Sequence, residues 1–247
     1  WGIYLLIRYL KNSHYWYLAG ALVGLLLATS ANLTLINSCL VISLVIVLSI
    51  LVNRRLVIQL KLAHLITVFV WFALLYPLIN FAFELKERGA LYYGGKSGFW
   101  DYTGGTLAQL YLGHFSSLIA ILLTLIFLVI LALFFWIWKK NKLNVKELIQ
   151  ERHFIWVYLL VGSIAGIFAT RYILDVNFPE DRAAMYLFPY FIASFAFTAD
   201  VIGKDYSKIR LLLALPLFFF PIQFITKINL KTASFSMEER APQEFYE

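Results

Sequence analysis

Two arginines in this sequence are candidates for binding a phosphate group. Arg182 lies in the segment Asn177–Phe191 beside Glu180 and Asp181, and Arg171 closes the apolar block that precedes this segment. A guanidinium group binds a phosphate through two parallel, charge-assisted hydrogen bonds. The two arginines therefore predict recognition of a phosphate at the edge of an apolar region. The alternative is that Arg182 pairs with Asp181 or Glu180 and extends toward lipid headgroups.

The segment Phe83–His114 concentrates aromatic and charged side chains between two long apolar blocks. Flat aromatic rings can cover the apolar side of a sugar ring, and carboxylates accept hydrogen bonds from its hydroxyls. We therefore predict contacts with a sugar or an acceptor from this segment and from the following polar one. The residues predicted to make them are Asp101, Trp100, Tyr102, Lys96 and Asp181. The alternative is that the aromatic side chains only pack on one another.

Familiar cofactor motifs do not fit the sequence. Gly94–Ser97 reads GGKS, but the glycine that a phosphate-binding loop needs at its start is one position out of place. The four histidines are scattered without metal-ligand spacing, and the single cysteine, Cys39, excludes an intramolecular disulfide. No nucleophile elbow is present, so the catalytic residues stay unknown. We predict no evident cofactor, with a divalent cation held by carboxylates such as Asp101 as an open alternative.

The composition is typical of a membrane protein. Hydrophobic residues make up 62% of the 247 residues and charged residues 14%, against roughly 45–50% and about 25% in soluble domains. The apolar residues form long blocks with few charges, as transmembrane helices do. The net charge of +7 lies mostly in short segments between these blocks rather than on a basic face. We therefore predict membrane lipids, and no nucleic acid, as partners.

The apolar blocks predict an all-α fold, a polytopic transmembrane helix bundle of about seven complete spans. A partial span at Trp1–Ile7 precedes them. The predicted spans are Tyr15–Asn32, Leu35–Leu51, Leu62–Phe83, His114–Trp138, Phe154–Ile173, Met185–Val201 and Leu211–Ile225.

The charges between the spans alternate along the chain. Most of the 21 lysines and arginines fall in every second connection, which predicts that these connections are cytoplasmic. The predicted bundle covers residues 1–228, with outer loops at 83–114 and 174–184 on the opposite side. Residues 229–247 are predicted to begin an extracytoplasmic tail. We expect the two outer loops to lie together.

Three stretches of the sequence resemble a known family. Gly24–Arg55 is similar to the re-entering helix pair of GT-C integral-membrane glycosyltransferases, particularly the dolichyl-phosphate-mannose–protein mannosyltransferase-like and bacterial lipid-A or glycan-modifying branches. Leu91–Gly113 and Phe178–Phe191 resemble the outer-loop and Arg-x-x-x-Tyr-x-x-Pro features of bacterial members. Many relatives have a tyrosine next to the arginine, whereas Ala183 follows Arg182 in this chain.

The resemblance implies a sugar transfer in the outer leaflet of a bacterial inner (plasma) membrane. The donor would be a polyprenyl-phosphate sugar, and the acceptor a lipid, a glycan or a protein. Arg182, with Arg171 as helper and Tyr186, would bind the donor phosphate. The general base of the family lies in an acidic first outer loop, which we expect upstream of Trp1 in a longer protein.

Two other functions stay open at this point. The chain could belong to a transporter, a flippase, or a glycan polymerase or ligase component. It could also be a membrane scaffold whose loops only pack. A transporter more often carries ionisable residues at mid-membrane, whereas the charges here crowd the ends of the predicted spans. This distribution favours chemistry at the membrane surface.

Overall fold

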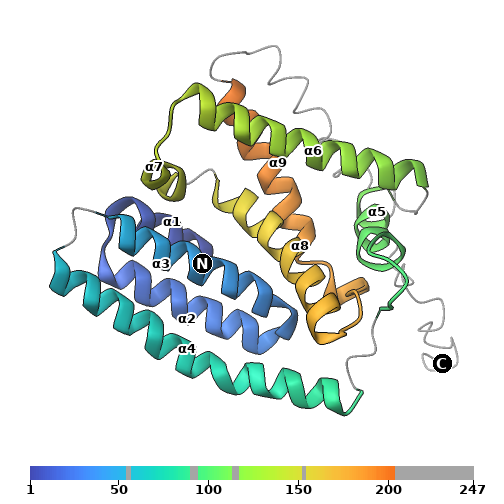
Figure 1. Ribbon diagram of the computed structural model, residues 1–247, viewed down its shortest axis with the longest axis horizontal. Coiled ribbons are helices and arrows are strands. Elements are labelled where there is room, and N and C mark those ends of the chain that lie inside the picture. The colour runs from blue at the N-terminus through green and yellow to red at the C-terminus, as the bar shows by residue number, and fades with distance from the viewer. Residues whose placement is uncertain (54–56, 90–93, 113–116, 152–153, 204–247) are drawn as a thin grey trace, which may run out of the picture.

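The protein is a bundle of helices in which α1–α4 form one group and α6, α8 and α9 form a second (Figure 1). The computed structural model describes residues 1–53, 57–89, 94–112, 117–151 and 154–203. Its elements are α1 (Gly2–Asn12), α2 (Tyr15–Ala31), η1 (Leu33–Leu35), α3 (Ile36–Val52), α4 (Ile58–Glu87), the π-helical turn η2 (Trp100–Gly104), α5 (Gly105–Leu112), α6 (Ser117–Lys140), α7 (Val145–Gln150), α8 (Ile155–Leu174), η3 (Asp181–Ala183) and α9 (Leu187–Gly203). The described residues form no β-strand, so the all-α prediction is confirmed for them.

Four helices are long and apolar enough to cross a membrane. They cover Leu33–Val52, Leu60–Glu87, Ser117–Lys140 and Ile155–Leu174, while α2 and α9 are shorter apolar helices. Side chains such as Phe69 and Leu118 on the outer faces are 74% and 77% exposed, which suits contact with lipid. Four of the seven predicted spans thus coincide with helices that are long and apolar enough to cross a membrane. The seventh predicted span, Leu211–Ile225, and the predicted tail at 229–247 lie outside the described residues.

Helix α1, where the sequence predicts the end of a partial span, packs along α2. Gly2 and Gly24 allow this close approach, because a Cβ on Gly24 would lie 3.1 Å from the Gly2 Cα. Leu6 and Leu10 are buried, while Arg8 is exposed on the opposite side of the helix. The helix is therefore amphipathic and belongs to the bundle.

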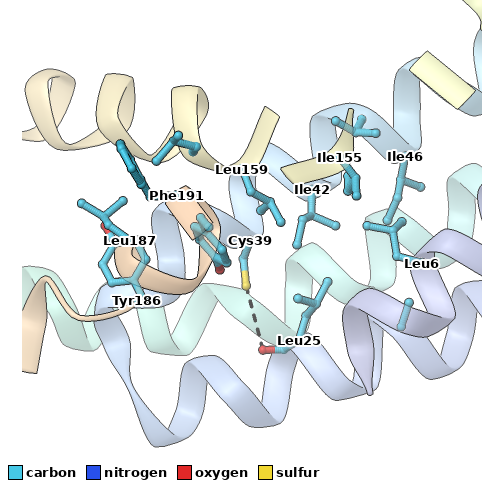
Figure 2. Close-up of a cluster of buried hydrophobic side chains, with 14 of the residues drawn as sticks. Leu6, Leu25, Cys39, Ile42, Ile46, Ile155, Leu159, Tyr186, Leu187 and Phe191 are labelled. Carbon is cyan, nitrogen blue, oxygen red and sulfur yellow. Dashed lines mark hydrogen bonds between the residues drawn. The ribbon is translucent and has the colours of Figure 1, made fainter. Parts of the chain in front are cut away.

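Helix α3 lies at the centre of the core and contacts both groups of helices. Figure 2 shows Cys39 and Ile42 of α3 facing Leu25 of α2 and Leu159 of α8. Gly162 and Gly166 bring α8 close to α3, since a Cβ at either position would meet Val41 or Asn37 within 3.1 Å. Hydroxyls join the same helices, with 3.1 Å between Ser38 Oγ and Ser163 Oγ. Small residues thus set the α3–α8 contact.

Two ends of the bundle differ in charge and in the length of their connections. At one end α4 and α8 finish, α6 begins, and η2 and η3 lie between them; we call this the loop end (Figure 1). At the other, the basic end, lie the α1–α2 turn and the α6–α7 connection. Lysines at the basic end include Lys11, Lys139, Lys140, Lys142 and Lys146.

The first predicted outer loop, residues 83–114, is more helical than expected. Helix α4 continues to Glu87 because Glu84–Glu87 are good helix formers. It stops where Gly89 takes a positive φ of 68° and its N–H donates to the Lys86 carbonyl. Further along, η2 and α5 turn the segment back toward the bundle.

Candidate functional site

The two predicted outer loops are bonded to each other at the loop end. The Phe178 N–H donates to the Gly95 carbonyl at 2.9 Å, forming an isolated antiparallel bridge. The Asn177 side-chain amide donates to the Gly94 carbonyl at 3.2 Å. Segments distant in the sequence therefore form one surface.

Two buried threonines fasten the second loop to the helical part of the first. The Thr103 hydroxyl donates to the Pro179 carbonyl at 2.6 Å. The Asp181 N–H donates to the Thr106 hydroxyl at 2.9 Å. Because Thr103 and Thr106 lie in η2 and α5, these helical turns fix the backbone from Pro179 to Asp181.

Gly94 makes this close approach possible. Its φ of +88° lies in the left-handed region, which other residues adopt only at a cost. A Cβ at this position would lie 1.8 Å from the Phe178 carbonyl oxygen. A side chain at position 94 is therefore incompatible with the docked arrangement of the loops.

An aromatic cluster anchors both loops on α8. The Phe99 ring stacks on Phe168 with a centroid distance of 5.3 Å. Phe178 meets both rings edge-on, at 6.2 Å from Phe99 and 5.6 Å from Phe168. Part of the aromatic content of the first loop is therefore used in packing, as the alternative interpretation of the sequence held.

A small ion-pair network spans the loops. Asp175 accepts from Lys96 of the first loop at 2.6 Å and from Arg171 of α8. These hydrogen bonds, from Lys96 first and then Arg171, lower the pKa of the Asp175 carboxyl. Asp175 is 66% exposed and the Arg171 side chain only 16%. Arg171 and Lys96, predicted to contact donor phosphate and sugar, thus hold a carboxylate of the protein itself.

The other predicted sugar contacts border the docked loops. Trp100 and Tyr102 are half-buried, and their rings lie over Gly104 and Gly95, where an added Cβ would meet them at 2.1 Å. Asp101 lies between them with its side chain exposed.

The second loop carries the other predicted residues. Asp181 begins η3 with an exposed side chain and a φ of 48°. Burial, and then the nearby Asp181 carboxylate, raise the pKa of its neighbour Glu180. The backbone of Arg182 belongs to η3, and its side chain lies outside the part of the chain that the structure describes. Tyr186 is buried, and its hydroxyl bonds to the Asn37 side chain.

A groove of about 380 Å³ opens beside these loops. The beginning of α3, the ends of α4 and α8 and the second loop form its walls. Its lining is largely apolar, with polar groups from Thr34, Asn37, Lys86, Thr170, Asn177 and Tyr186. Of these, the sequence analysis singled out Tyr186 and missed Lys86 and Asn37.

The helical spacing of the lining residues is a signal that the sequence contained. Ile79, Phe83 and Lys86 recur at one face of α4, and Leu33, Asn37 and Leu40 at one face of η1 and α3. Spacing alone does not say that these faces meet, so the groove required the assembled structure.

No metal centre accompanies the groove in the described part of the chain. Within residues 1–53, 57–89, 94–112, 117–151 and 154–203, no group of three or more His, Cys, Asp or Glu side chains could hold a metal ion. The divalent cation at Asp101 stays a prediction.

Comparison with protein-family models, with curated proteins and with solved structures finds no match to this chain. Function is therefore argued from the groove and the docked loops.

Proposed function

We propose that this chain is part of a membrane glycosyltransferase. It would move a sugar from a polyprenyl-phosphate donor to a lipid, glycan or protein acceptor at the outer face of a bacterial plasma membrane. In this proposal the chain forms about seven spans and a partial one. The basic end faces the cytoplasm, in keeping with the excess of lysine and arginine there.

One observation carries the proposal: an apolar groove shares a wall with the docked loops. Asn177, Pro179 and Tyr186 line the groove, and the Pro179 carbonyl accepts the hydrogen bond from Thr103 of the first loop. A lipid-linked sugar has the same division into a hydrocarbon chain and a polar head. The apolar groove suits the hydrocarbon chain of the lipid, and the polar surface of the docked loops suits the sugar.

The exposed groups at the loop surface suggest roles in the transfer. Asp101 can accept hydrogen bonds from sugar hydroxyls, and Trp100 and Tyr102 can cover the apolar side of the sugar. In the reaction the acceptor hydroxyl oxygen bonds to the sugar carbon, the bond from that carbon to the polyprenyl phosphate breaks, and the hydroxyl proton passes to a general base. Fixed positive charge stabilises the phosphate as it leaves, and we assign this role to Arg182, with Arg171, which pairs with Asp175, as its helper.

The proposal is tested by transfer of a radiolabelled sugar in proteoliposomes that contain the full-length protein. Arg182→Ala should abolish transfer while membrane insertion stays unchanged. Arg88→Ala is the matched control, because Arg88 is an exposed arginine at the same end that pairs with Glu84. Unchanged turnover in Arg182→Ala would remove this residue from the site. Movement of the donor across the membrane without any new glycosidic bond would favour a transporter instead.

A further inference from the structure

The groove at the loop end has one basic group among its lining residues. Lys86, in the last turn of α4, is half-buried at the groove, and none of the described lining residues is an aspartate or a glutamate. A cation next to apolar walls is poorly hydrated and favours an anionic partner. The charge of the groove therefore complements an anion.

Lys86 differs from its basic neighbours in its contacts with described carboxylates. Arg88 pairs with Glu84, whose carboxylate also accepts from Asn80 at 3.1 Å. Lys96 and Arg171 both pair with Asp175. Among the residues that the structure describes, Lys86 forms no ion pair.

Other polar groups of the lining already bond within the protein. The Asn37 side chain bonds to the Tyr186 hydroxyl, and the Thr170 hydroxyl donates to the Ile167 carbonyl at 3.0 Å. The Asn177 amide donates to Gly94 of the other loop. Lys86 is thus the lining group best suited to contact an added anion.

The apolar part of the lining comes from three helices. Ile79 and Phe83 of α4, Leu40 of α3 and Ile167 and Leu174 of α8 face the same space. A hydrocarbon chain placed among them would be removed from water, and this burial of apolar surface stabilises a complex. A free phosphate ion would leave this surface unused.

We propose that the groove binds a polyprenyl phosphate. The hydrocarbon chain of this lipid would lie between α3, α4 and α8, and its phosphate would contact Lys86. The identity of the lipid rests on the proposed function, whereas the role of Lys86 rests on the groove alone. Lys86 would hold the phosphate of the bound lipid, and the same phosphate would be stabilised by Arg182 as it leaves the sugar.

Direct binding of a radiolabelled polyprenyl phosphate without a sugar tests this inference. With the full-length protein in nanodiscs, Lys86→Gln should weaken binding by about tenfold or more, and Lys86→Arg should retain most of it. Lys146→Gln is the matched control, since Lys146 is half-buried at the basic end. Ala82→Trp, which fills the groove, should weaken binding without changing any charge.

Three competitors establish the chemistry of the ligand. The uncharged polyprenol and inorganic phosphate should both compete poorly, and phosphatidylglycerol should compete less well than polyprenyl phosphate. Equal binding by Lys86→Gln, or equal competition by polyprenol, would overturn the role of Lys86. Equal competition by phosphatidylglycerol would make the groove a site for ordinary membrane lipid and overturn the proposed ligand.

The sugar-transfer assay separates this inference from the proposed function. Lys86-dependent binding in a protein that transfers no sugar would reject the glycosyltransferase and keep the site. Sugar transfer with binding that ignores Lys86 would do the reverse.

Discussion

The loop end and the α6–α7 connection at the basic end both join helices, but their hydrogen bonds differ in range along the sequence. At the loop end, bonds such as Thr103 to Pro179 join residues 76 apart in the sequence. In the α6–α7 connection, the Trp138 indole donates to the Leu143 carbonyl, only five residues away. Asn144 and Glu147 then close a capping box at the start of α7.

This contrast shows which of the two regions is held in place by distant parts of the chain. A capping box satisfies its own helix end and needs no other part of the chain. The loop-end bonds instead fix two loops in one position, as a preorganised site requires. Substitutions should therefore spread across both loops at the loop end and stay local in the α6–α7 connection.

The largest effect is expected from Gly94→Ala. The added Cβ would overlap the Phe178 carbonyl, and the alanine would have to adopt a left-handed φ. The change should cost about 3 kcal/mol or more and separate the loops, which faster hydrogen exchange at residues 175–183 would reveal. Gly89→Ala is the control, since it shares the positive φ but meets nothing within 4 Å. Equal effects at both glycines would mean that loop docking contributes nothing.

Thr103→Val is expected to come next. Valine keeps the shape of threonine but leaves the part-buried Pro179 carbonyl without its donor, at a cost of about 1–3 kcal/mol. Thermal unfolding in detergent and exchange at the second loop would both detect it. Thr124→Val removes a hydroxyl that bonds only within α6, so the second loop should keep its protection in that variant.

Asn144→Ala should destabilise α7 by about 1 kcal/mol, because it removes the cap from the Glu147 N–H. Exchange should rise in Val145–Gln150 and stay unchanged at the loop end. A change at residues 175–183 would show that the two ends are coupled after all.

The smallest effect is a pH dependence at Asp175. The pKa of this carboxyl lies below its ordinary value of 3.8 in the folded protein. Its pairing therefore stabilises the fold above that value and is lost as the pH falls through the folded pKa. As the pH falls below 3.8, the unfolding temperature of the wild type should decrease more steeply than that of Asp175→Asn. High salt should weaken the difference.

Glu180 provides a comparison of opposite sign. Its pKa is raised above 4.5, so ionisation costs stability as the pH rises from this value through the folded pKa. Glu180→Gln should therefore raise the unfolding temperature slightly at pH 7 and leave it unchanged at pH 4. A loss of stability at pH 7 would contradict this assignment.

The helices were predictable and the bonds between them were not. Apolar blocks long enough for lipid predict helices directly, and α3, α4, α6 and α8 follow those blocks closely. The alternation of charge predicted that the two loops lie together, but the pairing of Gly95 with Phe178 depends on the backbone of Gly94, which no pattern specifies.

The ion pairs at the loop end include one that the sequence analysis did not consider. The pairing of Arg182 with Asp181 or Glu180 stays a prediction, because the Arg182 side chain lies outside the described part of the chain. The pair of Arg171 with Asp175, at the helical spacing i, i+4, was not predicted. Lys86 gave no signal of its own, because its significance comes from the walls that α3 and α8 place opposite it.

One glycine on α8, Gly166, lies behind a residue of the groove lining. Gly166 lies against Asn37, and a methyl group there would come within 3.0 Å of the amide carbon. Asn37 in turn bonds to Tyr186 at the groove. A side chain at residue 166, which does not line the groove itself, would therefore push on Asn37 and change the shape of the groove lining.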